Sequence, residues 1–187
     1  MDIDEHVQLD KLAERLKHSD QDAYAEIFQC MHEPLLRYVY RIAKDEALAL
    51  DVLQDVFMKL WEKRLELEIQ VSLKALLYTM VRNRALNINR KRSRMMYDTE
   101  LVTENSTEVT ESLVENELHT GQLKAYFKTW VKELPPRRAE AFILSRYHAM
   151  SNREIGEVMG LSKRTVDTHI VHALRHLKRR YDQLGVT

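Results

Sequence analysis

Apolar residues recur at spacings of three and four along most of this chain of 187 residues, which is the periodicity of amphipathic helices. The pattern is clearest in DEALALDVLQDVFMKLWEKR, residues 45–64. One apolar stripe of this segment is formed by Ala49, Val52, Leu53, Val56, Phe57, Leu60 and Trp61. The chain contains only 4 glycines and 3 prolines, so it offers little turn chemistry for β-hairpins. We therefore predict an all-α protein.

One further helix is expected before this segment and one after it. The earlier one is expected to begin at a Ser19 cap and to end before Pro34, which predicts a break ahead of residues 35–43. Its apolar face is expected to consist of Ala23, Ile27 and Cys30. Because the neighbours of Cys30 are apolar, we expect a core thiol there rather than a redox switch. The later helix is expected to begin near Ser72, with a buried face of Leu73, Leu76, Leu77, Met80 and Val81.

A change in composition divides the chain near its middle. Between Met95 and Leu123 there is no lysine or arginine, whereas seven residues are acidic and are interleaved with serine and threonine. The hydrophobic spacing also fades there, as expected of a linker. We therefore predict two small helical domains, residues 1–96 and 121–187, joined by an acidic linker at residues 97–120.

The second half is expected to end in a helix-turn-helix. Two consecutive prolines separate the helical segments LKAYFKTWVKEL and AEAFILSRYH. Ser151 and Glu154 then match an S-x-x-E capping box that begins a short helix. Gly160 suits the left-handed position that ends this helix, and Ser162 can cap a longer one. The buried faces are predicted to consist of Ile155, Val158 and Met159, and of Val166, Ile170, Ala173, Leu174, Leu177 and Tyr181.

Charge is segregated on this last helix, although the whole chain has 29 basic and 29 acidic residues. A single acid, Asp167, accompanies the basic residues Lys163, Arg164, Arg175, Lys178, Arg179 and Arg180. The second helix of a helix-turn-helix inserts its first turns into the DNA major groove. The residues expected to face DNA are Lys163, Arg164, Thr165, Thr168, His169 and His172. A solvated basic helix is the alternative interpretation.

A second basic run lies between Arg82 and Arg94, where no acid interrupts the sequence. Asparagines alternate with its basic residues at positions 83, 87 and 89, and Tyr78 and Tyr97 lie nearby. This composition suits nucleic acid whose bases are partly unstacked. Taken alone, it is equally consistent with a solvated helix end.

The helix over residues 45–64 carries a different set of side chains on the side away from its apolar stripe. They are Asp51, Gln54, Asp55, Met58 and Glu62. Carboxylates and an exposed methionine beside an aromatic-rich core favour a protein-binding face over a catalytic site.

Three segments, in this order, resemble the extracytoplasmic-function group of bacterial sigma factors, in particular its iron-citrate-regulator-like branch common in Bacteroidetes. They are DVLQDVFMKLWEKR, LKALLYTMVRNRALNINRKR and ELPPRRAEAFILSRYHAMSNREIGEVMGLSKRTVDTHIVHALRHLKRR. The resemblance implies sigma domain 2 followed by sigma domain 4, with no independent domain 3 between them. It implies a sigma factor that binds core RNA polymerase and directs initiation at promoters with minus-10 and minus-35 elements.

The resemblance also implies roles for individual residues. In the family, the positions matched by Asp51, Gln54 and Asp55 bind the clamp helices of the polymerase β′ subunit, and Met58 lies on the same face. The loop at 66–72 and the helix that follows correspond to the parts that open and read the minus-10 element. The residues carried over to that role are Arg82, Asn83, Arg84, Asn87, Arg90 and Lys91. The helix from Lys163 corresponds to the reader of the minus-35 element.

Further partners follow from the resemblance. They are the β flap of the polymerase and an anti-sigma factor, which can be membrane-bound, whereas the chain itself is not expected to insert into a membrane. One departure from the family is Gly156, where relatives commonly have alanine, and a glycine inside a helix costs about 1 kcal/mol.

Other functional classes find less support in the sequence. A single cysteine excludes an intramolecular disulfide, and the acidic first residues do not match a signal peptide, so a cytoplasmic protein is expected. His169, His172 and His176 have spacings that can hold zinc, but no carboxylate or thiol is placed in sequence to complete a site. We predict no enzyme, metal or cofactor. The main alternative is a two-domain regulator that binds operators as a dimer through its helix-turn-helix.

Overall fold

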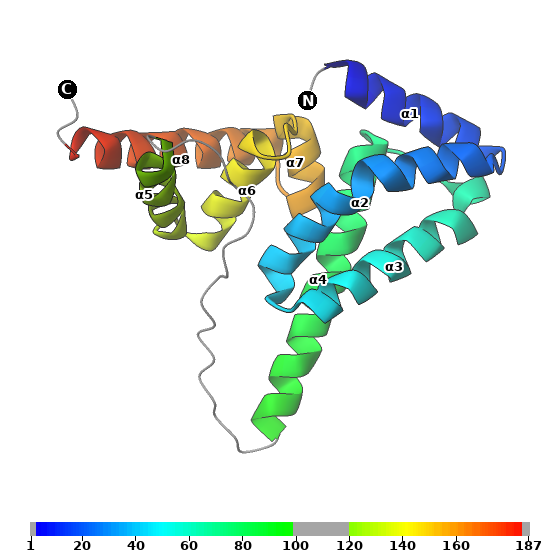
Figure 1. The fold of residues 1–187 in the computed structure, drawn as a ribbon, viewed down its shortest axis with the longest axis horizontal. Helices are drawn as coiled ribbons and strands as arrows, with labels where there is room; N and C mark the ends of the chain where they lie inside the picture. Colours follow the sequence, from blue (N-terminus) through cyan, green and yellow to red (C-terminus); the bar gives the residue numbers. More distant parts are fainter. Residues whose placement is uncertain (1–2, 99–119, 185–187) are drawn as a thin grey trace. The chain divides into compact units, whose positions relative to one another are not determined.

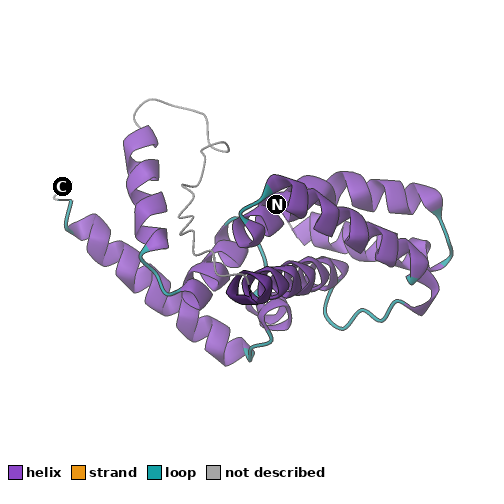
Figure 2. Ribbon diagram, turned by 90° about the horizontal axis from the view of Figure 1, so that it is seen from below, coloured by secondary structure: helices purple, strands orange, loops and turns teal. Residues whose placement is uncertain are grey.

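The computed structural model describes residues 3–98 and 120–184, and in these ranges the protein consists of helices and loops without a β-strand (Figures 1 and 2). The all-α prediction is confirmed. The chain divides into two compact units, residues 1–109 and 110–187. In the part of the chain that the structure describes, no helix is long and apolar enough to cross a membrane.

Within residues 3–98, the first unit is a bundle of four helices with one short 3-10 turn. Its elements are α1 (Ile3–Lys17), α2 (Gln21–Ala43), α3 (Glu46–Glu62), η1 (Arg64–Glu66) and α4 (Leu73–Asp98). The second helix, α2, packs against α1, α3 and α4. The fully buried side chains at the centre include Ile27, Met31, Leu35, Leu60, Leu73 and Leu77. The rings of Tyr38 on α2 and Tyr78 on α4 also meet there, with centroids 5.1 Å apart.

The start of α2 differs from the predicted Ser19 cap. Ser19 has a φ of 62°, in the left-handed region, and the next residue provides the cap instead. Asp20 has extended backbone angles, and its Oδ1 accepts a hydrogen bond of 3.0 Å from the backbone N–H of Ala23. An N-cap side chain must stand two or three residues before a free N–H, and Asp20 meets that requirement.

The predicted break at Pro34 is also wrong, because α2 continues through it from Gln21 to Ala43. A proline inside a helix removes one hydrogen bond to the carbonyl four residues earlier, here that of Cys30. Pro34 is half-buried and Cys30 is exposed, so the missing bond lies away from Met31 and Leu35, which stay fully buried in the core. The exposure of Cys30 also overturns the predicted core thiol. It lies one residue, or about 100°, from Met31 around the helix axis.

The helices α3 and α4 begin close to the predicted positions. Lys44 adopts the left-handed conformation that ends α2, and Asp45 caps α3 by accepting from Leu48 N–H at 3.1 Å. Six of the seven residues of the predicted α3 stripe are buried, and Trp61 is half-buried. On α4, Leu76 and Met80 are only half-buried, whereas Tyr78 and Ala85 are fully buried. The buried face of α4 is wider than predicted because three helices pack around it.

The second unit consists of α5 (Thr120–Lys132), α6 (Pro136–Arg146), α7 (Asn152–Met159) and α8 (Lys163–Asp182). Pro136 occupies the first turn of α6, where its missing N–H costs nothing. The core between α5, α6 and α8 is formed by Trp130, Val131, Leu134, Phe142, Ile143, Ala173 and Leu177. Leu174 and Tyr181 were predicted to be buried on α8, but each is 41% exposed. The helices α5 and α6 cover only the side of α8 that carries Ala173 and Leu177.

The predicted helix-turn-helix is confirmed in its local chemistry. The backbone N–H of Ser151 donates to Glu154 Oε2 at 2.8 Å, and the Ser151 side chain accepts from the backbone N–H of Glu154, which completes the capping box. Gly160 has φ 63° and ψ 43°, the left-handed conformation predicted for the end of α7. Ser162 Oγ accepts from Thr165 N–H at 3.1 Å and caps α8.

Gly156 is required by the closeness of this turn. It is buried, and a Cβ atom there would lie 2.7 Å from the carbonyl oxygen of Leu161. The backbone N–H of Leu161 in turn donates to the carbonyl of Gly156 at 2.8 Å. Both contacts belong to backbone, so neither can move aside as a flexible side chain would. The departure from the family at this position therefore accompanies a tight approach between the end of α7 and the start of α8.

We expect Gly156→Ala to destabilise the second unit. Relief of the glycine cost would add about 1 kcal/mol of stability, but overpacking against the Leu161 carbonyl costs about 1–3 kcal/mol. Urea unfolding followed by Trp130 fluorescence, in a Trp61→Phe background, measures the net change. A more stable variant would show that the turn has room for a methyl group.

Candidate nucleic-acid interfaces and protein-binding face

The first turns of α8 bring together all six residues predicted to face DNA; we call this set the α8 face. Lys163, Arg164, Thr168 and His172 are exposed, and Thr165 and His169 are partly buried. The hydroxyl of Thr165 lies 2.8 Å from Ser162 Oγ, so this residue also takes part in the cap. The α8 face therefore offers two cations, hydroxyls and two imidazoles at the amino-terminal end of a helix, where the helix dipole also favours anions.

The only acid on this part of α8 has a structural role. Asp167 accepts a hydrogen bond from the side chain of Asn152, the first residue of α7. The bond links the two helices of the helix-turn-helix and partly satisfies the carboxylate. Asp167 is half-buried, so its charge projects less toward the α8 face than the sequence alone suggests.

The sequence interpretation missed two arginines next to the α8 face. Arg137 and Arg138 lie in the first turn of α6, and both contribute to the lowered pKa of His169. Burial of the imidazole is the larger cause, followed by Arg138, Arg137 and His172. Both effects disfavour the protonated imidazole. Their position in the sequence, directly after the two consecutive prolines that precede α6, was the signal from which they could have been predicted.

The far half of α8 holds the bundle together. Glu133, just after α5, accepts from Arg180 Nη2 at 2.5 Å and lies 3.1 Å from His176 Nε2. The hydrogen bond from Arg180 is the main cause of the lowered pKa of Glu133. His176 thus has a carboxylate partner that its sequence neighbours did not reveal. Among the described residues, no group of three or more histidine, cysteine or acidic side chains could hold a metal ion.

The second basic run lies on α4, around and beyond Ala85, the last fully buried residue described on that helix; we call its six predicted DNA-binding residues the α4 face. Asn83, Asn87, Arg90 and Lys91 are exposed, and Arg82 and Arg84 are half-buried. Figure 1 shows α4 extending past the other helices of its unit. An exposed basic helix end of this kind can track a phosphate backbone while its asparagines donate to base edges.

Three neighbours of the α4 face have other roles than expected. Tyr78 is fully buried, and its burial raises the pKa of its hydroxyl, so it cannot stack on a base. Asn89 donates to the carbonyl of Ile42 near the end of α2 at 2.8 Å. Arg92 donates to Asp45 Oδ2 at 3.1 Å. The side chain of Tyr97 lies outside the described residues.

The predicted protein-binding residues share one side of α3, which we call the α3 face. Asp51, Gln54 and Met58 are exposed, and Met58 reaches 52%. Asp55 is half-buried and forms an ion pair with Arg84 of α4, in which Oδ2 accepts from Nε at 2.9 Å and from Nη2 at 2.5 Å. The α3 face and the α4 face therefore meet at this pair. The basic run is free of acids in sequence, but folding supplies them from Asp55 and Asp45.

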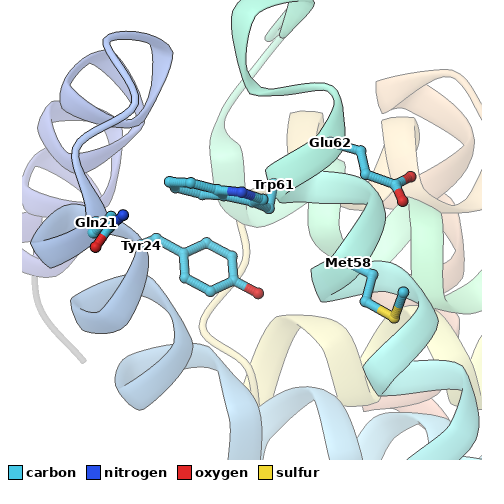
Figure 3. A pocket seen from close by; sticks show the side chains of 5 residues that line it. All are labelled: Gln21, Tyr24, Met58, Trp61 and Glu62. Carbon is cyan, nitrogen blue, oxygen red and sulfur yellow. The ribbon is translucent and has the colours of Figure 1, made fainter.

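The α3 face continues into an open groove between α2 and α3 (Figure 3). The groove is lined by Gln21, Tyr24, Met58, Trp61 and Glu62. The rings of Tyr24 and Trp61 meet edge to face, with centroids 5.3 Å apart, and the guanidinium of Arg64 lies 4.2 Å from the Trp61 centroid. The groove is thus walled by fixed aromatic side chains and a flexible methionine, a combination typical of protein-binding surfaces.

Comparisons with known proteins match a different family model to each of the two units. Residues 27–95 match the family model Sigma-70 region 2, and residues 126–177 match Sigma-70, region 4, so that the two together cover more than half of the chain. Relatives in Bacillus subtilis (strain 168) include RNA polymerase sigma factor SigZ, 23% identical over 73% of this chain and 74% of its own. Another is ECF RNA polymerase sigma factor SigW, 23% identical over 95% of this chain and 99% of its own.

A solved structure has a similar fold. It is that of the sigma factor RpoE from Bartonella quintana in complex with the anti-sigma factor NepR. The TM-score is 0.67 at 24% identity, and the match covers 87% of this chain and 98% of that one. The predicted fold, a sigma domain 2 helical bundle and a sigma domain 4 helix-turn-helix, is confirmed.

We expect Arg138→Ala to raise the pKa of His169. The substitution removes a positive charge that disfavours the imidazolium form, and it also opens the site to water. NMR titration of the His169 ring measures the change. Arg175→Ala, an exposed arginine later on α8, serves as the control and should leave that pKa unchanged. Equal results for both variants would show that the start of α6 does not face His169.

Proposed function

Because the chain belongs to the sigma-70 family, within its extracytoplasmic-function group, we propose that it binds core RNA polymerase and directs it to promoters. Members of this family are transcription factors rather than enzymes. The observation that carries the proposal is the presence of two basic faces on two different units, each of which matches a different sigma region. The finer placement in the iron-citrate-regulator-like branch rests on sequence motifs alone and stays a prediction.

In this proposal each unit corresponds to one sigma domain. Residues 1–96 form domain 2 and residues 121–187 form domain 4. The acidic linker is assigned to residues 97–120, most of which lie outside the described residues. Since its polymerase partner is cytoplasmic, the chain would act in the cytoplasm.

The α8 face is proposed to read the minus-35 element. Arg164 and Lys163 are exposed in the first turn of α8, where the second helix of a helix-turn-helix contacts base edges and phosphates. A bidentate arginine contact discriminates guanine by about 1–3 kcal/mol. Arg137 and Arg138 at the start of α6 add positive charge beside this face.

The α4 face is proposed to hold the minus-10 element as it opens. Arg90 and Lys91 are exposed and suited to phosphates, whereas Asn83 and Asn87 are suited to the edges of unpaired bases. The loop at residues 66–72 precedes α4 and is assigned to the same step. Tyr78 is excluded from it by burial.

The α3 face is proposed to bind the β′ clamp helices of the polymerase, through Asp51, Gln54, Asp55 and Met58. Exposed carboxylates beside an apolar groove can pair with basic residues of a partner helix while the groove takes its apolar side chains. The β flap is the expected partner of the second unit. An anti-sigma factor is a further proposed partner, since the similar RpoE structure was solved in complex with NepR.

Transcription in vitro with bacterial core polymerase tests both DNA assignments. Start sites mapped on genomic DNA should share a minus-35 and a minus-10 element. On such a promoter, Arg164→Ala should weaken binding by roughly 1–3 kcal/mol and relax preference at one minus-35 position. Asn83→Ala should leave initial binding intact and slow DNA opening, measured by permanganate reactivity of thymines near the start site.

Lys178→Ala, an exposed cation in the later half of α8, is the control for lost charge and should show neither specific effect. If Arg164→Ala slowed DNA opening and Asn83→Ala changed the minus-35 preference, the assignment of the two faces would be reversed. A two-fold footprint from the chain alone would instead favour a dimeric operator-binding regulator.

Charge reversal on the α3 face tests the polymerase contact. Asp51→Lys should weaken binding to core polymerase by on the order of 1–2 kcal/mol, because it places a like charge in the proposed interface. Asp51 is exposed, so unfolding stability should change by no more than about 0.5 kcal/mol. The matched control, Glu46→Lys, changes an exposed residue of the same helix about 140° around its axis. Equal affinity of the two variants for polymerase would contradict the assignment.

A further inference from the structure

The ion pair between Asp55 and Arg84 joins two surfaces that have different proposed partners. Asp55 belongs to the α3 face and Arg84 to the α4 face, and the two side chains are 40% and 41% exposed. Both hydrogen bonds from Arg84 end on one oxygen, Oδ2. In the part of the chain that the structure describes, the other oxygen, Oδ1, makes no hydrogen bond.

We propose that this pair is an exchangeable latch, in which Asp55 neutralises Arg84 in the free protein and releases it to DNA when polymerase engages the α3 face. The inference rests on the proposed function, because it takes Asp55 as a polymerase contact and Arg84 as a DNA contact. A basic group of the polymerase can approach Asp55 through its open Oδ1. As that group pairs with the carboxylate, the ion pair between Asp55 and Arg84 weakens.

The exposure of the pair makes such an exchange feasible. Ion pairs at a water-accessible surface contribute little net free energy, because solvent screens them and replaces their partners readily. A buried pair could not be opened without leaving an uncompensated charge. Release would add one cation to the α4 face beside Asn83 and Asn87. The binding of polymerase and of DNA would then favour one another, and the coupling would be equal in both directions.

A second ion pair, between Asp45 at the start of α3 and Arg92 of α4, has a different construction. Asp45 accepts from Arg92 through Oδ2, but its Oδ1 also accepts from Leu48 N–H and caps α3. The bond from Leu48 is the larger cause of the lowered pKa of Asp45, and Arg92 is the next. Both oxygens are engaged, and losing this carboxylate would fray the start of α3. Of the two pairs, Asp55 with Arg84 is therefore the one with an open oxygen and no capping role.

A double-mutant cycle on the full chain tests the latch. The probe is a fluorescein-labelled single-stranded DNA oligonucleotide, and binding is followed by anisotropy at low salt without polymerase. Asp55→Ala should raise affinity for the oligonucleotide by about two- to fivefold more than Glu62→Ala, the size expected from an exposed pair. Glu62 is an exposed carboxylate later on α3, so this control removes the same charge without releasing Arg84.

The gain should disappear in an Arg84→Ala background, because no arginine is left to release. Asp55→Asn keeps the shape of the side chain and should give a smaller gain in the same direction. Equal gains in affinity from Asp55→Ala and Glu62→Ala would overturn the latch, because the gain would then come only from the change in net charge. A gain that persists without Arg84 would overturn it as well.

A second measurement separates the latch from the function on which it rests. The affinity of core RNA polymerase for the chain is measured with and without the oligonucleotide. The DNA should strengthen polymerase binding to the wild type by about two- to fivefold more than to Asp55→Ala. If DNA strengthens both equally, the latch fails while the sigma function stands. If the wild type neither binds polymerase nor supports promoter-specific transcription, the proposed function fails, and the latch as a response to polymerase fails with it.

Discussion

The burial of the first half of α4 sets the position of everything else in the first unit. Leu73, Leu77 and Tyr78 are fully buried where α4 meets α1, α2 and α3. Burying side chains of this size contributes about 1.5–3 kcal/mol each, more than any surface contact of the α4 face can supply. The start of the helix is fixed further by Asp10 of α1, whose Oδ1 accepts from Leu73 N–H at 3.0 Å. The core therefore aims the basic end of α4, and no residue of the α4 face has to do so.

In the second unit, the α8 face is likewise positioned by residues outside it, here by the turn between α7 and α8. The α8 face precedes the part of α8 that packs on α5 and α6 through Ala173 and Leu177. Its direction is decided at the turn, where Gly156, Gly160 and the Ser162 cap fix the angle between α7 and α8. Small errors at the turn would be magnified along α8, which explains why this short segment contains so many specific hydrogen bonds.

Polar contacts between helices then connect the functional faces to the scaffold. Asp167 is used to link α7 and α8, and Glu133 is used to hold α5 against α8. Asp45 and Asp55 both pair with arginines of α4. Glu133, Asp45 and Asp55 are distant in sequence from the basic helices that they partly neutralise, whereas Asp167 belongs to α8 itself and bonds to a neutral amide. Part of the positive charge of α4 and α8 is therefore compensated within the fold.

The sequence by itself determined most of the helices and the helix-turn-helix, because these depend on local periodicity and on caps only three residues apart. The DNA and polymerase contacts that it assigns to exposed residues stay predictions. Ser151, Gly160 and Ser162 act within one turn of the chain, so their roles could be read directly. The tertiary structure alone decided which residues at the edges of apolar stripes are buried and which charged side chains form ion pairs. Cys30, Leu174 and Tyr181 lie at the edges of apolar stripes, where the partner helix determines burial. The pairing of Asp55 with Arg84 joins residues 29 positions apart, and only the packing of α3 against α4 brings them within hydrogen-bonding distance.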